Sequence, residues 1–188
     1  RGSDLPLRRS QTACALSHLS LWIELINSEH DHYIIFEDDV HFTSDFTSRL
    51  GELLGQILDR PQPDVIFLGL HYFDDAFSPK SSLQTLRSVV LENLMGGTFG
   101  YIISKSGAKQ LFEIVQNEGI AYGIDTFILN NSHRLRLFEA VPNIVAAPLY
   151  ASLIFPPIPP LHHQHCLSKF HKSSLPPSAL LMKIYQRK

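Results

Sequence analysis

Tyr33-Ile34-Ile35-Phe36-Glu37-Asp38-Asp39 is the stretch that decides the fold class. Its first four residues are β-branched or aromatic, and a short apolar run of this kind is typical of a buried strand. Three consecutive carboxylates follow at once. Ligand sites in open α/β sheets gather at the carboxyl ends of the strands, so this stretch predicts both a core strand and a site at its end.

Helices and strands alternate on both sides of this stretch. Apolar residues at helical spacing predict a helix over residues 14–27, with an inward face formed by Ala15, Leu19, Trp22, Ile23 and Ile26. The same pattern predicts a second helix capped by Ser44 or Asp45 and a third from about Ser104 to Gly119. Further strands are expected at residues 65–68, 98–103, 135–141 and 144–146, a loop at 71–82 and a short segment at 125–129. Strands separated by helices predict an α/β domain whose mostly parallel sheet is flanked by helices.

The composition describes one compact domain with an appendage. The 188 residues are 44% hydrophobic and 18% charged with a net charge of −2, which excludes extensive disorder and a strongly basic nucleic-acid binder. The composition changes at Pro156-Pro157-Ile158-Pro159-Pro160. We therefore predict a domain over residues 1–155 and a Pro/His-rich C-terminal tail over residues 156–188. Cys14 and Cys166 match no disulfide framework, which favours a reducing compartment.

The acidic triplet has the chemistry of a site for a hard cation. Alternation along a strand sends Glu37 and Asp39 to one face and Asp38 to the other. Three adjacent negative charges near a core are costly unless a cation offsets them, and oxygen ligands favour Mg²⁺ or Mn²⁺ over zinc. A solvated acidic turn after the strand remains the alternative interpretation.

Several motifs in one order resemble glycosyltransferase family 25, which contains bacterial lipopolysaccharide galactosyltransferases and is related to collagen galactosyltransferases. The resemblance covers about residues 10 to 146 and rests on Cys14-Ala15-Leu16-Ser17-His18 with Trp22, Ile35–Val40 with its Glu-Asp-Asp, Asp64–Gly69, Gly97–Ser104 with Gly107-Ala108, Ile124-Asp125 and Val141-Pro142. Ala13 and Gly100 stand where the family has Gly and Ala. The family also has a first strand before the Ser-His helix, whereas only about ten residues precede that helix here.

The resemblance implies a GT-A-like, Rossmann-like fold with the N-terminal strand missing, and transfer of a hexose, expected to be galactose, from a UDP-sugar. The acceptor would be a hydroxyl of a lipopolysaccharide or other oligosaccharide, the transfer would invert the anomeric centre, and Mn²⁺ or Mg²⁺ would assist. No nucleic acid is expected as a partner. The implied location is cytoplasmic, with peripheral contact at the inner face of a bacterial inner membrane.

The implied site residues fall into three roles. Asp39 and Glu37 are expected to bind the metal ion, and Asp125 is the expected catalytic base. Residues expected to contact the donor nucleotide-sugar or its metal are Glu37, Asp38, Ser17, His18, Gly97 and Tyr101.

Each assignment has a structural alternative. Asp125 could cap the Thr126–Asn130 segment, and Tyr101 could be a packing residue. Ser17 and His18 could fasten their helix to the acidic loop. Asp74 and Asp75 are further candidate bases, and a solvated turn is the favoured alternative for them. The tail could bind a metal through His162, His163, His165, Cys166 and His171, although a disordered or lightly packed tail is favoured. Leu180–Lys188 could be an interfacial anchor or a solvated helical end.

Two competing functions remain open. One is a truncated, catalytically inactive family member that acts as a scaffold or binding module. The other is a metal-dependent phosphoesterase that uses the acidic triplet, although it would need further His and Asp ligands at strand ends.

Overall fold

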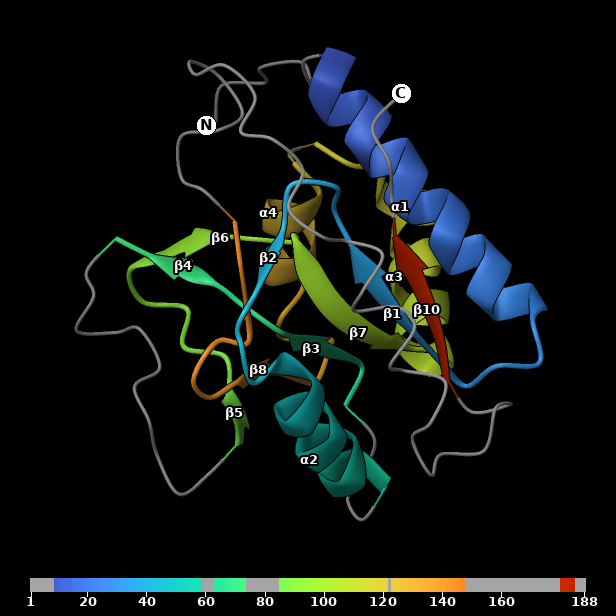
Figure 1. Cartoon of the computed structure of the whole chain (residues 1–188). Coiled ribbons are helices and arrows are strands. Elements are labelled where there is room, and N and C mark those ends of the chain that lie inside the picture. Colours follow the sequence, from blue (N-terminus) through green and yellow to red (C-terminus); the bar gives the residue numbers. More distant parts are fainter. Residues whose placement is uncertain (1–8, 59–62, 74–84, 122, 148–179, 185–188) are drawn as a thin grey trace.

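The computed structural model describes residues 9–58, 63–73, 85–121, 123–147 and 180–184. A mixed six-stranded sheet lies between helices on both of its faces (Figure 1). The helices are α1 (Arg9–Asn27), α2 (Phe46–Leu58), α3 (Lys105–Glu118) and α4 (Ile124–Asn130). The strands of the sheet are β1 (His32–Phe36), β3 (Val65–Phe67), β5 (Leu86–Ser88), β7 (Gly100–Ser104), β8 (Leu137–Ala140) and β10 (Leu180–Ile184). Two short ribbons pair β2 (His41–Phe42) with β9 (Val145–Ala146) and β4 (His71–Tyr72) with β6 (Leu94–Gly96).

The strand directions correct the prediction of a mostly parallel sheet. The strand order is β10-β1-β7-β3-β8-β5, and β7 runs antiparallel to both β1 and β3. Only β1–β10 and β3–β8 are parallel among the five pairings of this sheet. The reason lies in how the chain reaches β7. Between β3 and β7 the described residues form β4, β5 and β6, and none of them forms the crossover helix that usually joins parallel neighbours. The strand that follows, β7, runs in the opposite direction to β3.

Alternate residues of the central strands supply two separate cores. Tyr33, Ile35, Phe67, Tyr101 and Ile103 belong to the core beneath α1, α3 and α4. Ile34, Phe36, Ile66, Leu68 and Ile102 belong to the core beneath α2, which lies on the opposite side of the sheet in Figure 1. Because both faces are covered, the central strands carry runs of consecutive apolar residues, such as Tyr33–Phe36 in β1 and Tyr101–Ile103 in β7, rather than an alternation of apolar and polar ones.

The third helix begins and ends where the sequence predicts. The Ser104 hydroxyl accepts a hydrogen bond from the Gly107 backbone N–H at 3.0 Å, and Gly119 ends the helix with a φ of 75°. Both residues suit these positions, since serine caps helix starts and glycine tolerates positive φ.

The buried stripe of α1 differs from the predicted face. Ile23 was expected to face inward, yet its side chain is 40% exposed. The stripe runs instead through Ala15, His18, Trp22 and Leu25, at helical spacings of three and four. A histidine therefore occupies a core position on this helix and is fully buried.

Part of the predicted tail belongs to the sheet. Leu180–Ile184 forms β10, which pairs in parallel with β1 from His32↔Leu180 to Phe36↔Ile184. The alternative of a helical end for this segment is thus wrong. The tail histidines, Cys166, Asp74 and Asp75 lie outside the described residues. Among the helices that the structure describes, none has the length and hydropathy to cross a membrane.

The close packing of α3 on the sheet predicts a stability effect at Gly107. A Cβ there would lie 2.4 Å from the backbone oxygen of Asp64 and 2.9 Å from its carbonyl carbon. Backbone atoms cannot rotate away, so Gly107→Ala is expected to lower the free energy of unfolding by about 2 kcal/mol. Gly51→Ala is the matched control, since nothing lies within 4 Å of its Cβ position in α2. Better helix propensity should raise stability there by up to about 1 kcal/mol. Urea unfolding of both variants checks this, and an unchanged midpoint in Gly107→Ala would contradict it.

Candidate active site

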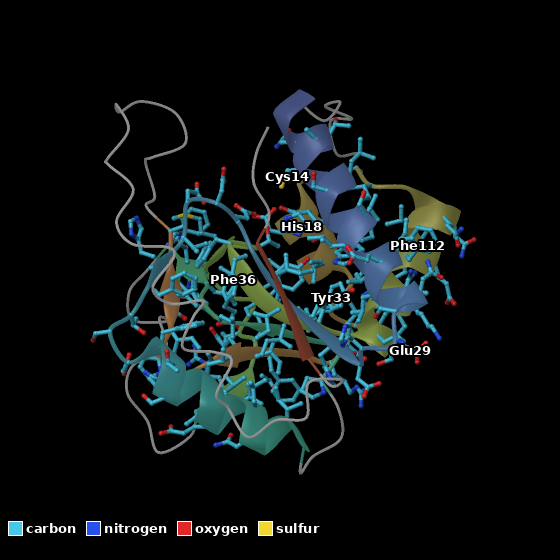
Figure 2. The ribbon with its side chains drawn as sticks, turned by 45° about the vertical axis from the view of Figure 1, so that its right-hand side comes forward. Cys14, His18, Glu29, Tyr33, Phe36 and Phe112 are labelled. Carbon is cyan, nitrogen blue, oxygen red and sulfur yellow. The ribbon has the colours of Figure 1, made fainter. Side chains whose placement is uncertain are left out.

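Four segments meet at the edge of the sheet where β1 ends. They are the acidic triplet after β1, the Gly96–Phe99 segment before β7, the N-terminal half of α1 and the start of α4. The Glu37 backbone N–H donates to the Phe99 oxygen at 3.0 Å, which continues the β1–β7 pairing into the triplet. Figure 2 labels Cys14 and His18 on α1, where both side chains lie on the side of the helix that faces the strands.

The Glu37 carboxylate is held from two sides. Thr98 Oγ1 donates to Glu37 Oε1 at 3.0 Å, and His18 Nε2 lies 3.6 Å from the same oxygen. The Thr98 and His18 side chains are buried, whereas 13% of the Glu37 side chain is exposed. The carboxylate therefore sits at the boundary between the core and the edge of the sheet.

Asp38 and Asp39 lie in a turn, since β1 ends at Phe36. The alternation expected to place Glu37 and Asp39 on one face of a strand therefore does not extend to these two residues. Both side chains are half-buried, and the Asp39 Oδ1 atom is enclosed. Carboxylate oxygens are hard donors, so the chemistry of the triplet fits Mn²⁺ or Mg²⁺. Asp39 and Glu37 could hold such an ion.

Tyr101 is fully buried beneath α1, and its hydroxyl contacts two side chains of that helix. His18 Nδ1 lies 2.8 Å from the hydroxyl oxygen, and Trp22 Nε1 donates to it at 3.0 Å. Burial raises the pKa of the Tyr101 hydroxyl well above its usual range, so the phenol stays protonated. Its predicted contact with the donor sugar stays a prediction, and its observed contacts hold His18 in place.

Ser17 makes a bond within its own helix. Its hydroxyl donates to the Ala13 backbone oxygen at 2.9 Å. This contact is common for serine inside helices and assigns no ligand to the side chain. The predicted role of Ser17 toward the donor stays a prediction.

Asp125 reaches the same edge from α4. Its Oδ1 accepts from the Thr126 backbone N–H at 2.7 Å, while a Cβ on Gly96 would lie only 2.4 Å from its Oδ2. Gly96 and Gly97 have φ values of 127° and 138°, which favour glycine strongly. The N-cap of α4 is Gly123, and Asp125 lies in the first turn of the helix. The alternative that Asp125 caps this helix is therefore wrong. The missing side chain of Gly96 lets the backbone approach this carboxylate closely.

Comparison with known proteins shows which family the chain belongs to. The family model described as glycosyltransferase family 25 (LPS biosynthesis protein) matches residues 2–128. The chain belongs to glycosyltransferase family 25. The resemblance inferred from the motifs is thereby confirmed.

Three relatives illustrate the range of this family. Human Procollagen galactosyltransferase 2 is 33% identical over 111 residues, which are 58% of this chain and 17% of that protein. A bovine protein named "Probable inactive glycosyltransferase 25 family member 3" is 30% identical over 110 residues, 58% of this chain and 18% of its own. A Haemophilus influenzae protein named "Putative glycosyltransferase" is 28% identical over 145 residues, 75% of this chain and 49% of its own. The chain thus spans about half or less of the length of these relatives.

Two residues of this family 25 site carried no assigned role in the sequence interpretation. Thr98 lies inside a motif that was quoted for the resemblance, yet only its bond to Glu37 gives it a role. Cys14 lies one helical turn before His18, and ligand-type atoms of Cys14, His18 and Glu37 all lie within 4.8 Å of one another. The four-residue spacing of Cys14 and His18 on a helix was the available signal, because it places both on one face.

Proposed function

We propose that this chain forms the donor-binding and catalytic part of a glycosyltransferase. It transfers a hexose, galactose, from a UDP-sugar to an acceptor hydroxyl with inversion. Membership of family 25 and the similarity to a procollagen galactosyltransferase support the reaction class. The observation that carries the proposal is the contact of one segment, Gly96–Phe99, with both Glu37 and Asp125. Two carboxylates suited to different tasks are therefore at the same edge of the sheet.

The first task is to bind the diphosphate of the donor. As the bond from sugar C1 to the β-phosphate oxygen breaks, negative charge develops on the leaving diphosphate. Asp39 and Glu37 would hold Mn²⁺ or Mg²⁺, which when bound supplies positive charge to stabilise that diphosphate. Asp38 and the backbone at Gly97 line the same edge and would contact the nucleotide or its ion.

The second task is to remove the proton of the acceptor hydroxyl. The acceptor oxygen forms a bond to C1 from the face opposite the UDP leaving group, and its proton passes to a carboxylate. Asp125 is suited to this step because its Oδ1 is engaged with the first turn of α4, while its Oδ2 lies against Gly96. That bond orients the carboxylate without occupying both of its oxygens.

For the acceptor we propose an oligosaccharide, either free or lipid-linked, because the family description names lipopolysaccharide biosynthesis. A lipid-linked acceptor would bring the protein to the cytoplasmic face of a bacterial inner membrane as a peripheral protein. Co-sedimentation with anionic vesicles, compared between the wild type and the double variant Arg187→Gln/Lys188→Gln, which leaves β10 in place beside β1, measures whether the basic C-terminal end contributes to that contact.

An inactive binding module is the second candidate, because a relative whose name marks it as inactive aligns with more than half of this chain. Calorimetric titration with UDP, with and without Mn²⁺, combined with an assay of UDP release from UDP-galactose, separates the two candidates. Mn²⁺-dependent binding with UDP release supports the transferase. Binding without release supports the module, and absence of UDP binding under both conditions contradicts the donor site altogether.

A further inference from the structure

The directions of the hydrogen bonds at Tyr101 follow from the chemistry of its partners. An indole N–H can only donate, so the 3.0 Å contact from Trp22 Nε1 makes the tyrosine oxygen an acceptor. Tyr101 still carries its own O–H proton. Within the part of the chain that the structure describes, the other hydrogen-bond partner of this oxygen is His18 Nδ1 at 2.8 Å. A fully buried hydroxyl that donates to nothing is costly, so Tyr101 donates to His18 Nδ1.

This direction decides which nitrogen of His18 bears the proton. Because Nδ1 accepts, it carries no proton, and the single N–H of the neutral ring lies on Nε2. Nε2 faces Glu37 Oε1 at 3.6 Å. The His18 ring is stacked on Tyr101, with ring centroids 5.6 Å apart and an interplanar angle of 24°. The N–H on His18 Nε2 is thus directed toward the Glu37 carboxylate. A small movement of the two side chains, or one bridging water, would complete a hydrogen bond between them.

We propose that Trp22, Tyr101 and His18 form a one-directional hydrogen-bond relay that locks His18 as the Nε2–H tautomer. His18 is then the positioning residue of Glu37, to which it presents a donor and never an acceptor. Thr98 donates to the same oxygen of Glu37 at 3.0 Å, so both neighbours favour one orientation of the ionised carboxylate. The link from Glu37 to donor binding rests on the proposed function, whereas the relay itself does not.

The relay excludes a different interpretation of the same cluster. A thiol, an imidazole and a carboxylate within 4.8 Å of one another resemble a zinc-binding set, formed here by Cys14, His18 and Glu37. A metal ion on Nε2 would need the lone pair of that nitrogen, which moves the proton to Nδ1. Tyr101 would then lose the acceptor of its buried O–H. Zinc binding through His18 and the relay are therefore mutually exclusive, and the buried Trp22–Tyr101 pair favours the relay.

The tautomer is measured directly by nuclear magnetic resonance of protein labelled with ¹⁵N-histidine, at about pH 8, where an ordinary histidine is neutral. The His18 signals are identified by their absence in His18→Gln. Wild-type protein is expected to show a single Nε2–H tautomer for His18. Tyr101→Phe removes the donor to Nδ1 and is expected to give a mixture of tautomers or the Nδ1–H form. Trp22→Phe removes the other bond of the same hydroxyl and is expected to keep the Nε2–H form.

A matched control exists in the same core. Tyr33 is buried on β1 beneath α1, and its hydroxyl donates to Glu24 at 3.3 Å, away from the relay. Tyr33→Phe removes a tyrosine hydroxyl from this core and is expected to leave both the His18 tautomer and UDP binding unchanged. A general loss of packing would affect Tyr33→Phe and Tyr101→Phe alike.

The positioning role is measured by Mn²⁺-dependent UDP affinity. Tyr101→Phe is expected to weaken it roughly 10-fold, the usual effect of removing a residue that orients a ligand. His18→Gln, whose amide can still donate to Glu37, is expected to lose less affinity than His18→Leu.

An Nδ1–H tautomer in wild type overturns the relay, as does stoichiometric zinc binding that perturbs His18 and is lost in Cys14→Ser. Unchanged UDP affinity in Tyr101→Phe with an altered tautomer overturns the positioning role. If wild type binds no UDP, the proposed function and the positioning role both fail, and the wild-type tautomer still decides the relay.

Discussion

Asp125→Asn is expected to lower the turnover of sugar transfer by roughly 10²–10⁴-fold while Mn²⁺-dependent UDP affinity stays close to that of the wild type. The amide cannot accept the proton of the acceptor hydroxyl. It keeps a carbonyl oxygen that can accept from the Thr126 N–H, as Asp125 Oδ1 does at 2.7 Å. The start of α4 should therefore survive, and the melting temperature should change little. Steady-state kinetics, UDP titration and thermal unfolding of one preparation measure all three quantities.

The control for this variant is Glu113→Gln, the same change of carboxylate to amide at an exposed position of α3. It is expected to retain wild-type turnover. Gly96→Ala offers an independent test of the same carboxylate, because the added methyl would overlap Asp125 Oδ2 and strain a backbone with φ of 127°. It should reduce turnover by displacing Asp125. Full turnover in Asp125→Asn would end the assignment of the base.

Asp39→Asn is expected to abolish the Mn²⁺ dependence of UDP binding. An amide is a far poorer ligand for a hard divalent ion than a carboxylate, so the ion that would hold the diphosphate is lost. The fold should persist and its stability should stay equal or rise slightly, because one of three adjacent negative charges in the triplet disappears. Titration with UDP in the presence and absence of Mn²⁺ and thermal unfolding measure these two effects.

Asp31→Asn is the matched control, because Asp31 is an exposed aspartate at the opposite end of β1. It changes the net charge by the same amount and should leave Mn²⁺-dependent UDP binding intact. Comparison of the two variants separates the loss of an ion ligand from the effect of charge alone. Mn²⁺-dependent UDP binding that persists in Asp39→Asn would rule out its role as a metal ligand.

Features that depend only on neighbouring residues in the chain were predictable from the sequence. The strand before Glu37 follows from its β-branched and aromatic run, and β1 is indeed buried on both faces. The start and end of α3 follow from the Ser104 hydroxyl and the positive φ of Gly119. Family membership was predictable for a related reason, since each motif is a short run of residues in a recognisable order. Local propensity and local motifs need no knowledge of what packs against them.

Features decided by distant contacts were not predictable. Tyr101 and His18 were each assigned to the donor, yet 83 residues separate them in the chain and a hydrogen bond joins them in the core. Thr98 gains its role only because the start of β7 lies beside the end of β1. Periodicity placed Ile23 on the buried face of α1 and did not identify His18 there, since apolarity alone cannot find a polar residue that is satisfied in the core.

The sequence by itself determined the order and type of the main elements, the acidic triplet at the end of β1 and the family. Only the tertiary structure decided the antiparallel direction of β7, the addition of β10 beside β1 and the distances from Glu37 to His18 and Thr98. The physical reason is that strand partners and buried hydrogen bonds depend on the return path of the chain. Several segments of the chain could pair with a given strand, and the packing of the whole domain determines which of them does.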